Sequence, residues 1–122
     1  MRIVMPGIPD KKIVYRMSRS YYRDLLKAGV KIYEYSPGFV HAKACLADDC
    51  VGSIGTVNLD YRSLYLHYEC NALFYNASIL ADLKEDFEAS MKVSKERTLQ
   101  DEKKGLLYRI INGTLRIFAP LV

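Results

Sequence analysis

The chain has 122 residues, of which 50% are apolar and 26% are charged, and its formal net charge is +4. This length suits one compact domain, 1–122, and the composition excludes a disordered or low-complexity chain. The three cysteines, an odd number without paired spacing, argue against a disulfide framework or a zinc site. The positive charge suits anionic partners such as phospholipid headgroups or nucleic acid, without naming either.

The first part of the chain predicts a strand, a helix and a second strand. A short strand at 2–5 ends in a cluster of proline and glycine, and Asp10 can cap a helix that runs to about Ala28. Gly29 ends that helix, and the β-rich run 30–35 follows it. This order predicts a βαβ crossover, with some parallel pairing in an α/β fold.

The second part predicts three further strands and two helices. Residues 39–47 alternate with period two, which is typical of a strand. The segments that follow are a turn at Asp48-Asp49, a strand at 50–54, a polar loop at 55–63, a strand at 66–75, a helix capped by Ser78, a charged connector at 94–104, and an amphipathic helical segment at 105–122. We expect this last segment to pack on the domain or to lie on a membrane surface without crossing it.

The residues with chemical potential lie between His41 and Asn58. His41 and Lys43 are two apart on a predicted strand and therefore share one face. One can act as nucleophile or proton carrier, while the other offers a fixed positive charge to a phosphate. A loop of Gly55, Thr56 and Asn58 can add backbone N–H groups, a hydroxyl and a carboxamide around the same anion. Phosphoryl transfer needs little more than these parts.

Each residue alone is weak evidence, because a strand histidine is usually structural and a lone lysine is usually solvated. The joint pattern H-x-K-x4-D-x6-G-[ST]-x-N, which includes Asp48, is specific because it fixes five positions within 18 residues. It resembles the HKD signature of the phospholipase D superfamily. The similarity extends to further segments that look like the C-terminal portion of bacterial cardiolipin synthases, namely 6–12, 58–63, 68–72 and 117–121.

The resemblance implies a role for each residue of the motif. His41 would attack phosphorus and form a phosphohistidine intermediate, which is covalent catalysis. Lys43 and Asn58 would hold the non-bridging oxygens of the phosphate. Glu69 would hydrogen-bond the second imidazole nitrogen and fix its tautomer. Asp48 would orient the loop of the motif rather than contact substrate.

The loop after the motif also receives expected roles from the resemblance. Gly55 and Thr56 would bind phosphate, with Thr56 standing where the family more often has serine. Asp60, Arg62 and Ser63 would either shape the headgroup pocket or brace the loop by a local ion pair. The resemblance implies no cofactor and no metal.

One departure from the family concerns the number of motifs. The family's active site uses two facing motifs, with one histidine as nucleophile and the other as general acid. His67, the other histidine of this chain, lacks a lysine two positions on, and we expect it at the surface of a sheet. The expected fold is therefore one half of the usual two-lobed enzyme, a mixed sheet flanked by helices. We expect a fragment of a longer enzyme, with a homodimer that completes its site and an excised domain as alternatives.

The leading functional hypothesis is phosphatidyl transfer between two phosphatidylglycerol molecules, which gives cardiolipin and glycerol at the bacterial cytoplasmic membrane. The partners would be phosphatidylglycerol, a membrane surface and a second HKD half, in a longer chain or by homodimerisation. One alternative is a homodimeric nuclease or phosphodiesterase, although nucleic acid is the less expected partner. Another alternative is a non-catalytic module that binds lipid or a protein partner.

Overall fold

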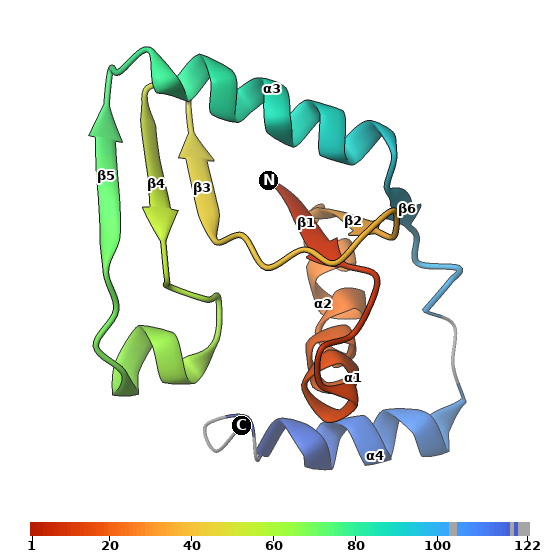
Figure 1. Ribbon diagram of the computed structural model, residues 1–122. Helices are drawn as coiled ribbons and strands as arrows, with labels where there is room; N and C mark the ends of the chain where they lie inside the picture. Colours follow the sequence, from red (N-terminus) through yellow and green to blue (C-terminus); the bar gives the residue numbers. More distant parts are fainter. Residues whose placement is uncertain (103–104, 118, 120–122) are drawn as a thin grey trace.

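The computed structural model of the chain describes residues 1–102, 105–117 and 119. The chain forms two three-stranded sheets and several helices, which confirms the expected mixed α/β class (Figure 1). The strands divide between two small sheets, one mixed and one purely antiparallel.

The first sheet has the order β1-β2-β6. Strand β1 (Arg2–Pro6) pairs in parallel with β2 (Lys31–Tyr35), which confirms the predicted βαβ crossover. Strand β6 (Lys95–Arg97) pairs antiparallel with β2, inside the segment expected to be a charged connector. That expectation was wrong because the strand is only three residues long and all charged, so its pairing depends on β2 rather than on its own pattern.

The predicted helix from Asp10 to about Ala28 is two helices, α1 (Lys12–Ser20) and α2 (Tyr22–Lys27). At Tyr21 the backbone N–H donates to the carbonyl of Ser18 at 3.1 Å, a tightened turn that separates the two. The N-cap position is occupied by Lys11 rather than Asp10. The predicted stop at Gly29 agrees with its φ of +83°, a conformation that favours glycine.

The second sheet consists of β3 (Ala44–Ala47), β4 (Val51–Gly55) and β5 (Asn71–Tyr75), all antiparallel. The turn at Asp48-Asp49 lies between β3 and β4, with both residues at positive φ, which aspartate tolerates. Strand β3 begins at Ala44, whereas the alternation predicted a strand from residue 39.

Between β4 and β5 the chain forms a short π-helical turn, η1 (Arg62–Leu66), where a polar loop and the start of a strand were expected. Asp60 explains the difference, because its carboxylate accepts the backbone N–H of Ser63 at 2.8 Å. Its carbonyl accepts the N–H of Leu64 at 3.1 Å. This capping holds a helical turn, so the strand predicted from residue 66 begins only at Asn71.

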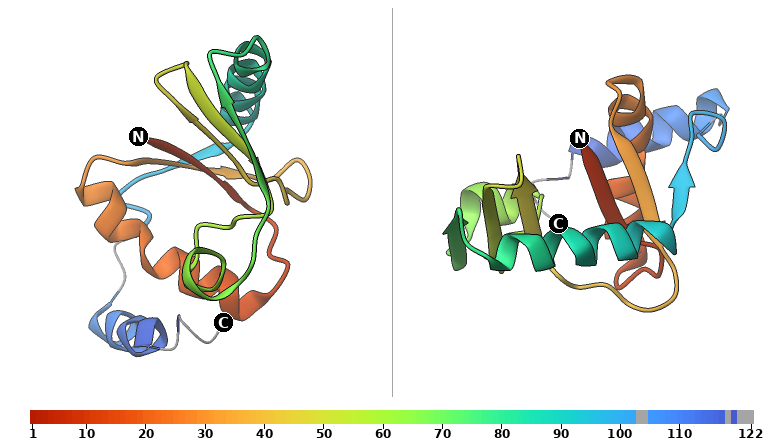
Figure 2. Two further views of the ribbon diagram at one scale, coloured as in Figure 1. Left: turned by 90° about the vertical axis from the view of Figure 1, so that its left-hand side faces the viewer. Right: turned by 90° about the horizontal axis from the view of Figure 1, so that it is seen from above.

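Helix α3 (Ile79–Lys92) contacts both sheets. Ser78 lies at its N-cap position, as predicted, although its hydroxyl makes no capping hydrogen bond. The buried side chains Leu80 and Leu83 pack against Gly52 of β4, where a Cβ would lie 2.6 Å from Leu80. Around the first sheet the views show α3 on one side and α1 with α2 on the other (Figures 1 and 2).

Helix α4 (Leu106–Ile117) packs against α1 as the outermost layer, below the α1–α2 pair (Figure 2). The buried carboxamide of Asn112 accepts a hydrogen bond from Arg16 at 3.4 Å. Positions 118 and 120–122 of the predicted segment 105–122 lie outside the described residues. Within the described part of the chain, no helix combines the length and the apolar character needed to cross a membrane.

Candidate functional site

His41 and Lys43 lie in direct contact on the segment that leads into β3. The Lys43 ammonium nitrogen is 3.0 Å from each ring nitrogen of His41 and donates to the His41 carbonyl oxygen at 2.8 Å. Because an ammonium can only donate, the ring nitrogen that accepts from it carries no proton. The Phe39 ring stacks on the imidazole with centroids 5.9 Å apart, and His41 is exposed to solvent.

The two parts of the sequence motif are held together by the edge of the sheet. The Lys43 carbonyl accepts the backbone N–H of Gly55 at 3.1 Å, which fixes the start of β3 against the end of β4. A Cβ on Gly55 would overlap the Asn71 side-chain oxygen and the Cys70 carbonyl. Glycine is therefore required here by close approach of two strands.

The backbone N–H groups of the loop after Gly55 are already bonded within the protein. Thr56 donates to the Cys70 carbonyl at 3.0 Å, and Val57 donates to the Asn71 side-chain oxygen at 3.3 Å. These two N–H groups hold the sheet edge together. They are therefore not the free N–H donors that were expected to bind a phosphate. The Thr56 hydroxyl also accepts the Cys70 N–H at 2.9 Å, so it takes part in the same sheet edge.

Asn58 and Ser63 bring a carboxamide and a hydroxyl into the same region. The Asn58 side-chain nitrogen donates to the Ser63 hydroxyl at 3.3 Å, and Ser63 is only 7% exposed. Arg62 donates to the His67 ring nitrogen at 3.3 Å instead of pairing with Asp60. The loop is thus braced by the hydrogen bond from the Ser63 N–H to Asp60, and not by the ion pair between Asp60 and Arg62 that was one of the two expectations.

Glu69 lies at the centre of this polar cluster with a side chain that is 15% exposed. Hydrogen bonds from the hydroxyls of Thr56 and Ser63, with smaller contributions from the charges of His67 and Lys43, hold the pKa of the Glu69 carboxyl below its ordinary value. Its carboxylate oxygen is 4.0 Å from the His67 ring, so its nearest described imidazole partner is His67 rather than His41.

His67 is a member of the cluster that the sequence reasoning missed. It was expected at the surface of a sheet, but it follows η1 and lies between Arg62 and Glu69. The spacing of two between His67 and Glu69 was the available signal, since such residues share a face in an extended chain.

Asp48 lies apart from the other motif residues. It follows β3, whereas His41 and Lys43 precede it, and four strand residues span roughly 13 Å. The neighbouring Asp49 pairs with Lys84 of α3 at 2.5 Å. The structure therefore brings His41, Lys43, Asn58 and Glu69 to one end of the second sheet and leaves Asp48 at the other.

This arrangement has the parts for handling a phosphate diester. It offers an exposed imidazole in contact with a cation, two hydroxyls, a carboxamide and a carboxylate with a lowered pKa. Among the described residues, no group of three or more histidine, cysteine, aspartate or glutamate side chains is placed to hold a metal ion.

Comparison with known proteins identifies one family and several relatives. A family model described as cardiolipin synthase, PLD-like domain, matches residues 1–91. The chain is 47% identical to an uncharacterized protein of Streptococcus mutans serotype c, 41% identical to a cardiolipin synthase of Halalkalibacterium halodurans, and 42% identical to cardiolipin synthase 2 of Bacillus anthracis. Each match covers 100% of this chain but 27%, 24% and 24% of the respective relative, so the chain spans about a quarter of their length.

Proposed function

Because the chain belongs to the cardiolipin synthase family with a phospholipase D-like domain, we propose that it supplies one half of a phosphatidyl-transfer site centred on His41. The reaction joins two phosphatidylglycerol molecules to give cardiolipin and glycerol. The contact of the Lys43 ammonium with both ring nitrogens of His41 carries this proposal, because it combines a nucleophile and a phosphate-binding cation in one unit.

The proposed reaction has two displacements at phosphorus. An unprotonated ring nitrogen of His41 attacks the phosphate of the first lipid, forming a P–N bond while the P–O bond to glycerol breaks. The departing glycerol oxygen takes a proton from a general acid. In the second step a hydroxyl of the other phosphatidylglycerol attacks phosphorus, loses its proton to the same group, and breaks the P–N bond.

Lys43 has two roles in this scheme. Without substrate, its ammonium covers the lone pair that His41 needs for attack. An arriving phosphate competes for the same ammonium, because a charge-assisted bond to an anion is stronger than one to a neutral ring. Lys43 would then turn to a non-bridging oxygen and release the imidazole for attack.

The neighbouring polar groups complete the phosphate site. Asn58 can donate its second amide proton to another non-bridging oxygen, and the Thr56 hydroxyl, which accepts from Cys70, lies at the same end of the sheet. Glu69, whose carboxyl pKa is lowered, lies nearest to His67 and would stabilise the positive charge that develops on the His41 imidazole only from a distance. Asp48 would act at a distance, through the turn that joins β3 and β4.

The general acid would come from a second HKD half, which a longer chain or a homodimer can supply. The substrate would be an anionic phospholipid, and catalysis would take place at a membrane surface. A nuclease would need the same half-site, so the test must separate the two substrates.

A substrate with an activated leaving group tests the half-site without its acid. We expect phosphatidyl-nitrophenol to release nitrophenol in a burst, because nitrophenolate departs without protonation. Mass spectrometry should find the phosphatidyl group on His41, and His41→Ala should abolish both signals. His67→Ala is the matched control and should keep the adduct. Equal release by His41→Ala would contradict the proposal, and adduct formation from a thymidine nitrophenyl phosphodiester alone would favour the nuclease.

A further inference from the structure

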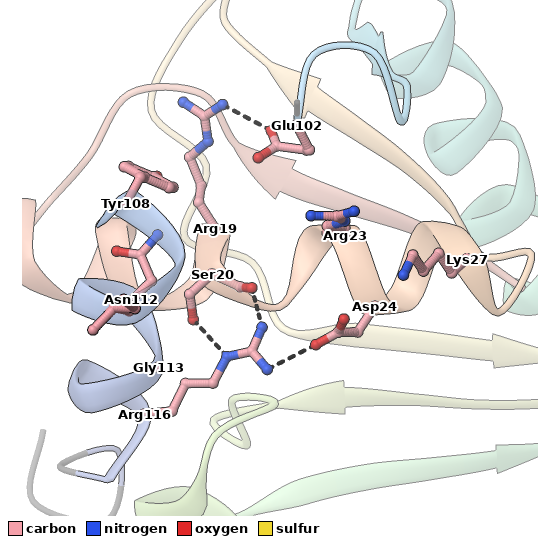
Figure 3. Close-up of a pocket in the computed structure, with 11 residues that line it drawn as sticks. Arg19, Ser20, Arg23, Asp24, Lys27, Glu102, Tyr108, Asn112, Gly113 and Arg116 are labelled. Atoms are coloured by element: carbon pink, nitrogen blue, oxygen red, sulfur yellow. Dashed lines mark hydrogen bonds and ion pairs between the residues drawn. The ribbon is translucent and has the colours of Figure 1, made fainter. Parts of the chain in front are cut away.

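A cavity of about 360 Å³ lies between the α1–α2 pair and α4 (Figure 3). Its size falls within the range of roughly 300–1,000 Å³ that is common for small-ligand sites. It shares no lining residue with the His41 cluster. Any ligand of this cavity is therefore independent of the chemistry proposed for His41.

The acidic residues of the cavity are neutralised by the protein itself. Asp24 accepts from Arg116 at 2.7 Å. Glu102, whose side chain is 4% exposed, accepts from Arg19 at 3.1 Å and from Arg97 at 3.0 Å. Neither carboxylate is left to repel an anion.

Two cations of the cavity remain available. Arg23 and Lys27 lie four residues apart on α2 and have no hydrogen-bond or ion-pair partner among the described residues. In Figure 3 their side chains come from the helix that also carries Asp24, across the cavity from the α4 residues. The cavity thus has an uncompensated positive charge, which favours an anionic ligand.

Arg116 adds a guanidinium that is already fixed in place. Its nitrogens donate to the Ser20 hydroxyl at 3.1 Å, to the Ser20 carbonyl and to Asp24, and its carbon lies 4.4 Å from the centre of the Tyr21 ring. These contacts use only part of the fork of N–H donors on a guanidinium. A fixed arginine with donors to spare is well suited to the oxygens of a phosphate.

One aliphatic side chain of α4, Ile110, lies among the polar residues that line the cavity. Ile110 lines the cavity and is 56% exposed, and Ile117, seven residues on and thus on the same face of the helix, is 73% exposed. Exposed isoleucines beside arginines are typical of a helix that lies at the interface of a membrane. A phosphate carried on an amphiphile would satisfy both parts of the surface.

We propose that the cavity between α2 and α4 is a second phosphate-binding site, in which Arg23, Lys27 and Arg116 hold the phosphate group of a lipid headgroup or of a soluble phosphate ester. The two sources share the same chemistry and differ in whether the exposed isoleucines of α4, Ile110 and Ile117, take part.

The test uses the whole chain with three probes. The soluble probes are inorganic phosphate and glycerol 3-phosphate, followed by NMR shifts of the α2 and α4 amides. The third probe is phosphatidylcholine vesicles with and without phosphatidylglycerol, followed by co-sedimentation. We expect the double variant Arg23→Ala/Lys27→Ala to bind at least about tenfold more weakly, because bonds to charged groups each contribute more than one tenfold step.

Two further variants keep the result interpretable. Lys31→Ala/Lys92→Ala removes the same charge from exposed positions outside the cavity and should bind as the unmodified chain does. Ile117→Ser should weaken vesicle binding without changing the response to soluble phosphate.

A phosphate-ester site is supported if soluble phosphate binds saturably and if, of the two double variants, only Arg23→Ala/Lys27→Ala weakens that binding. Binding of anionic vesicles alone, with the same dependence on the variant, supports the lipid source. Absence of binding to all three probes, or equal weakening by the control, would overturn the proposal.

Discussion

The ion-pair cluster between β2, β6 and α1 and the polar cluster around His41 both combine charges of opposite sign, but they differ in exposure. In the first, the side chains of Glu34 and Glu102 are 9% and 4% exposed and face Arg19 and Arg97 at 21% and 10%. Two acids are matched by two bases at nitrogen–oxygen distances of 3.0–3.7 Å. The charges of this cluster balance one another, and its ion pairs join α1 and the first sheet to the segment that follows β6.

The His41 cluster is more open to solvent, although Lys43 is half-buried and the Glu69 side chain is 15% exposed. His41, Asn58 and Arg62 are exposed, and the only described pairing of Glu69 with a basic side chain is the 4.0 Å contact with His67. A half-buried cation such as Lys43 loses little by exchanging one neutral partner for an incoming phosphate, whereas breaking a buried ion pair would leave an unpaired charge behind. The buried cluster therefore serves stability, whereas the more open cluster is suited to ligand chemistry.

The largest expected effect comes from breaking the buried cluster. Glu34→Ala leaves Arg19 and Arg97 with one buried partner fewer, and we expect the free energy of unfolding to fall by ~3–5 kcal/mol. Urea unfolding of the whole chain measures it. Lys84→Ala, which removes the exposed pair with Asp49 and leaves the positive-φ turn unchanged, is the control and should cost about 1 kcal/mol or less. An equal loss of unfolding free energy in the two variants would contradict the idea that the buried ion pairs contribute more to stability than the exposed one.

A smaller effect is expected from the backbone contact that shapes the open cluster. Gly55→Ala places a methyl group against the Asn71 side chain and the Cys70 carbonyl, and overpacking of this kind costs about 1–3 kcal/mol. It should also shift the amide NMR signals of Thr56 and Val57, because their hydrogen bonds cross the same gap. Gly38→Ala, where the nearest atom lies 4.0 Å from the new Cβ, should leave those signals unchanged. Unchanged signals in Gly55→Ala would show that the strands can separate freely.

The sequence predicts the parts of both regions that depend on local patterns. The βαβ unit follows from alternating strand and helix signals, and the contact of His41 with Lys43 follows from their spacing of two, although neither lies in a strand. The pairing of β6 with β2 depends on residues distant in sequence, and the turn at η1 depends on a cap within a polar loop. Such contacts carry no periodic signal. Glu102 pairs with Arg19, 83 positions away, and with Arg97, 5 positions away. The charge balance of the buried cluster therefore depends on folding and cannot be predicted from local sequence patterns.

The smallest expected effect is a change in the protonation of Glu69. Because the Thr56 hydroxyl is the largest cause of the lowered pKa, Thr56→Val should raise the pKa of Glu69 toward its ordinary value. A carboxyl whose pKa is lowered by folding contributes stability above its unfolded pKa, and this contribution is lost as the pH falls through the folded pKa. The variant should therefore lose less stability than the unmodified chain on acidification. Carboxyl NMR titration measures the shift, with Thr98→Val as the control, because it should raise the pKa of Asp101 alone. An unchanged Glu69 titration in Thr56→Val would mean that Ser63 and the nearby cations hold the carboxylate by themselves, and the open cluster would then depend on its charges more than on its hydroxyls.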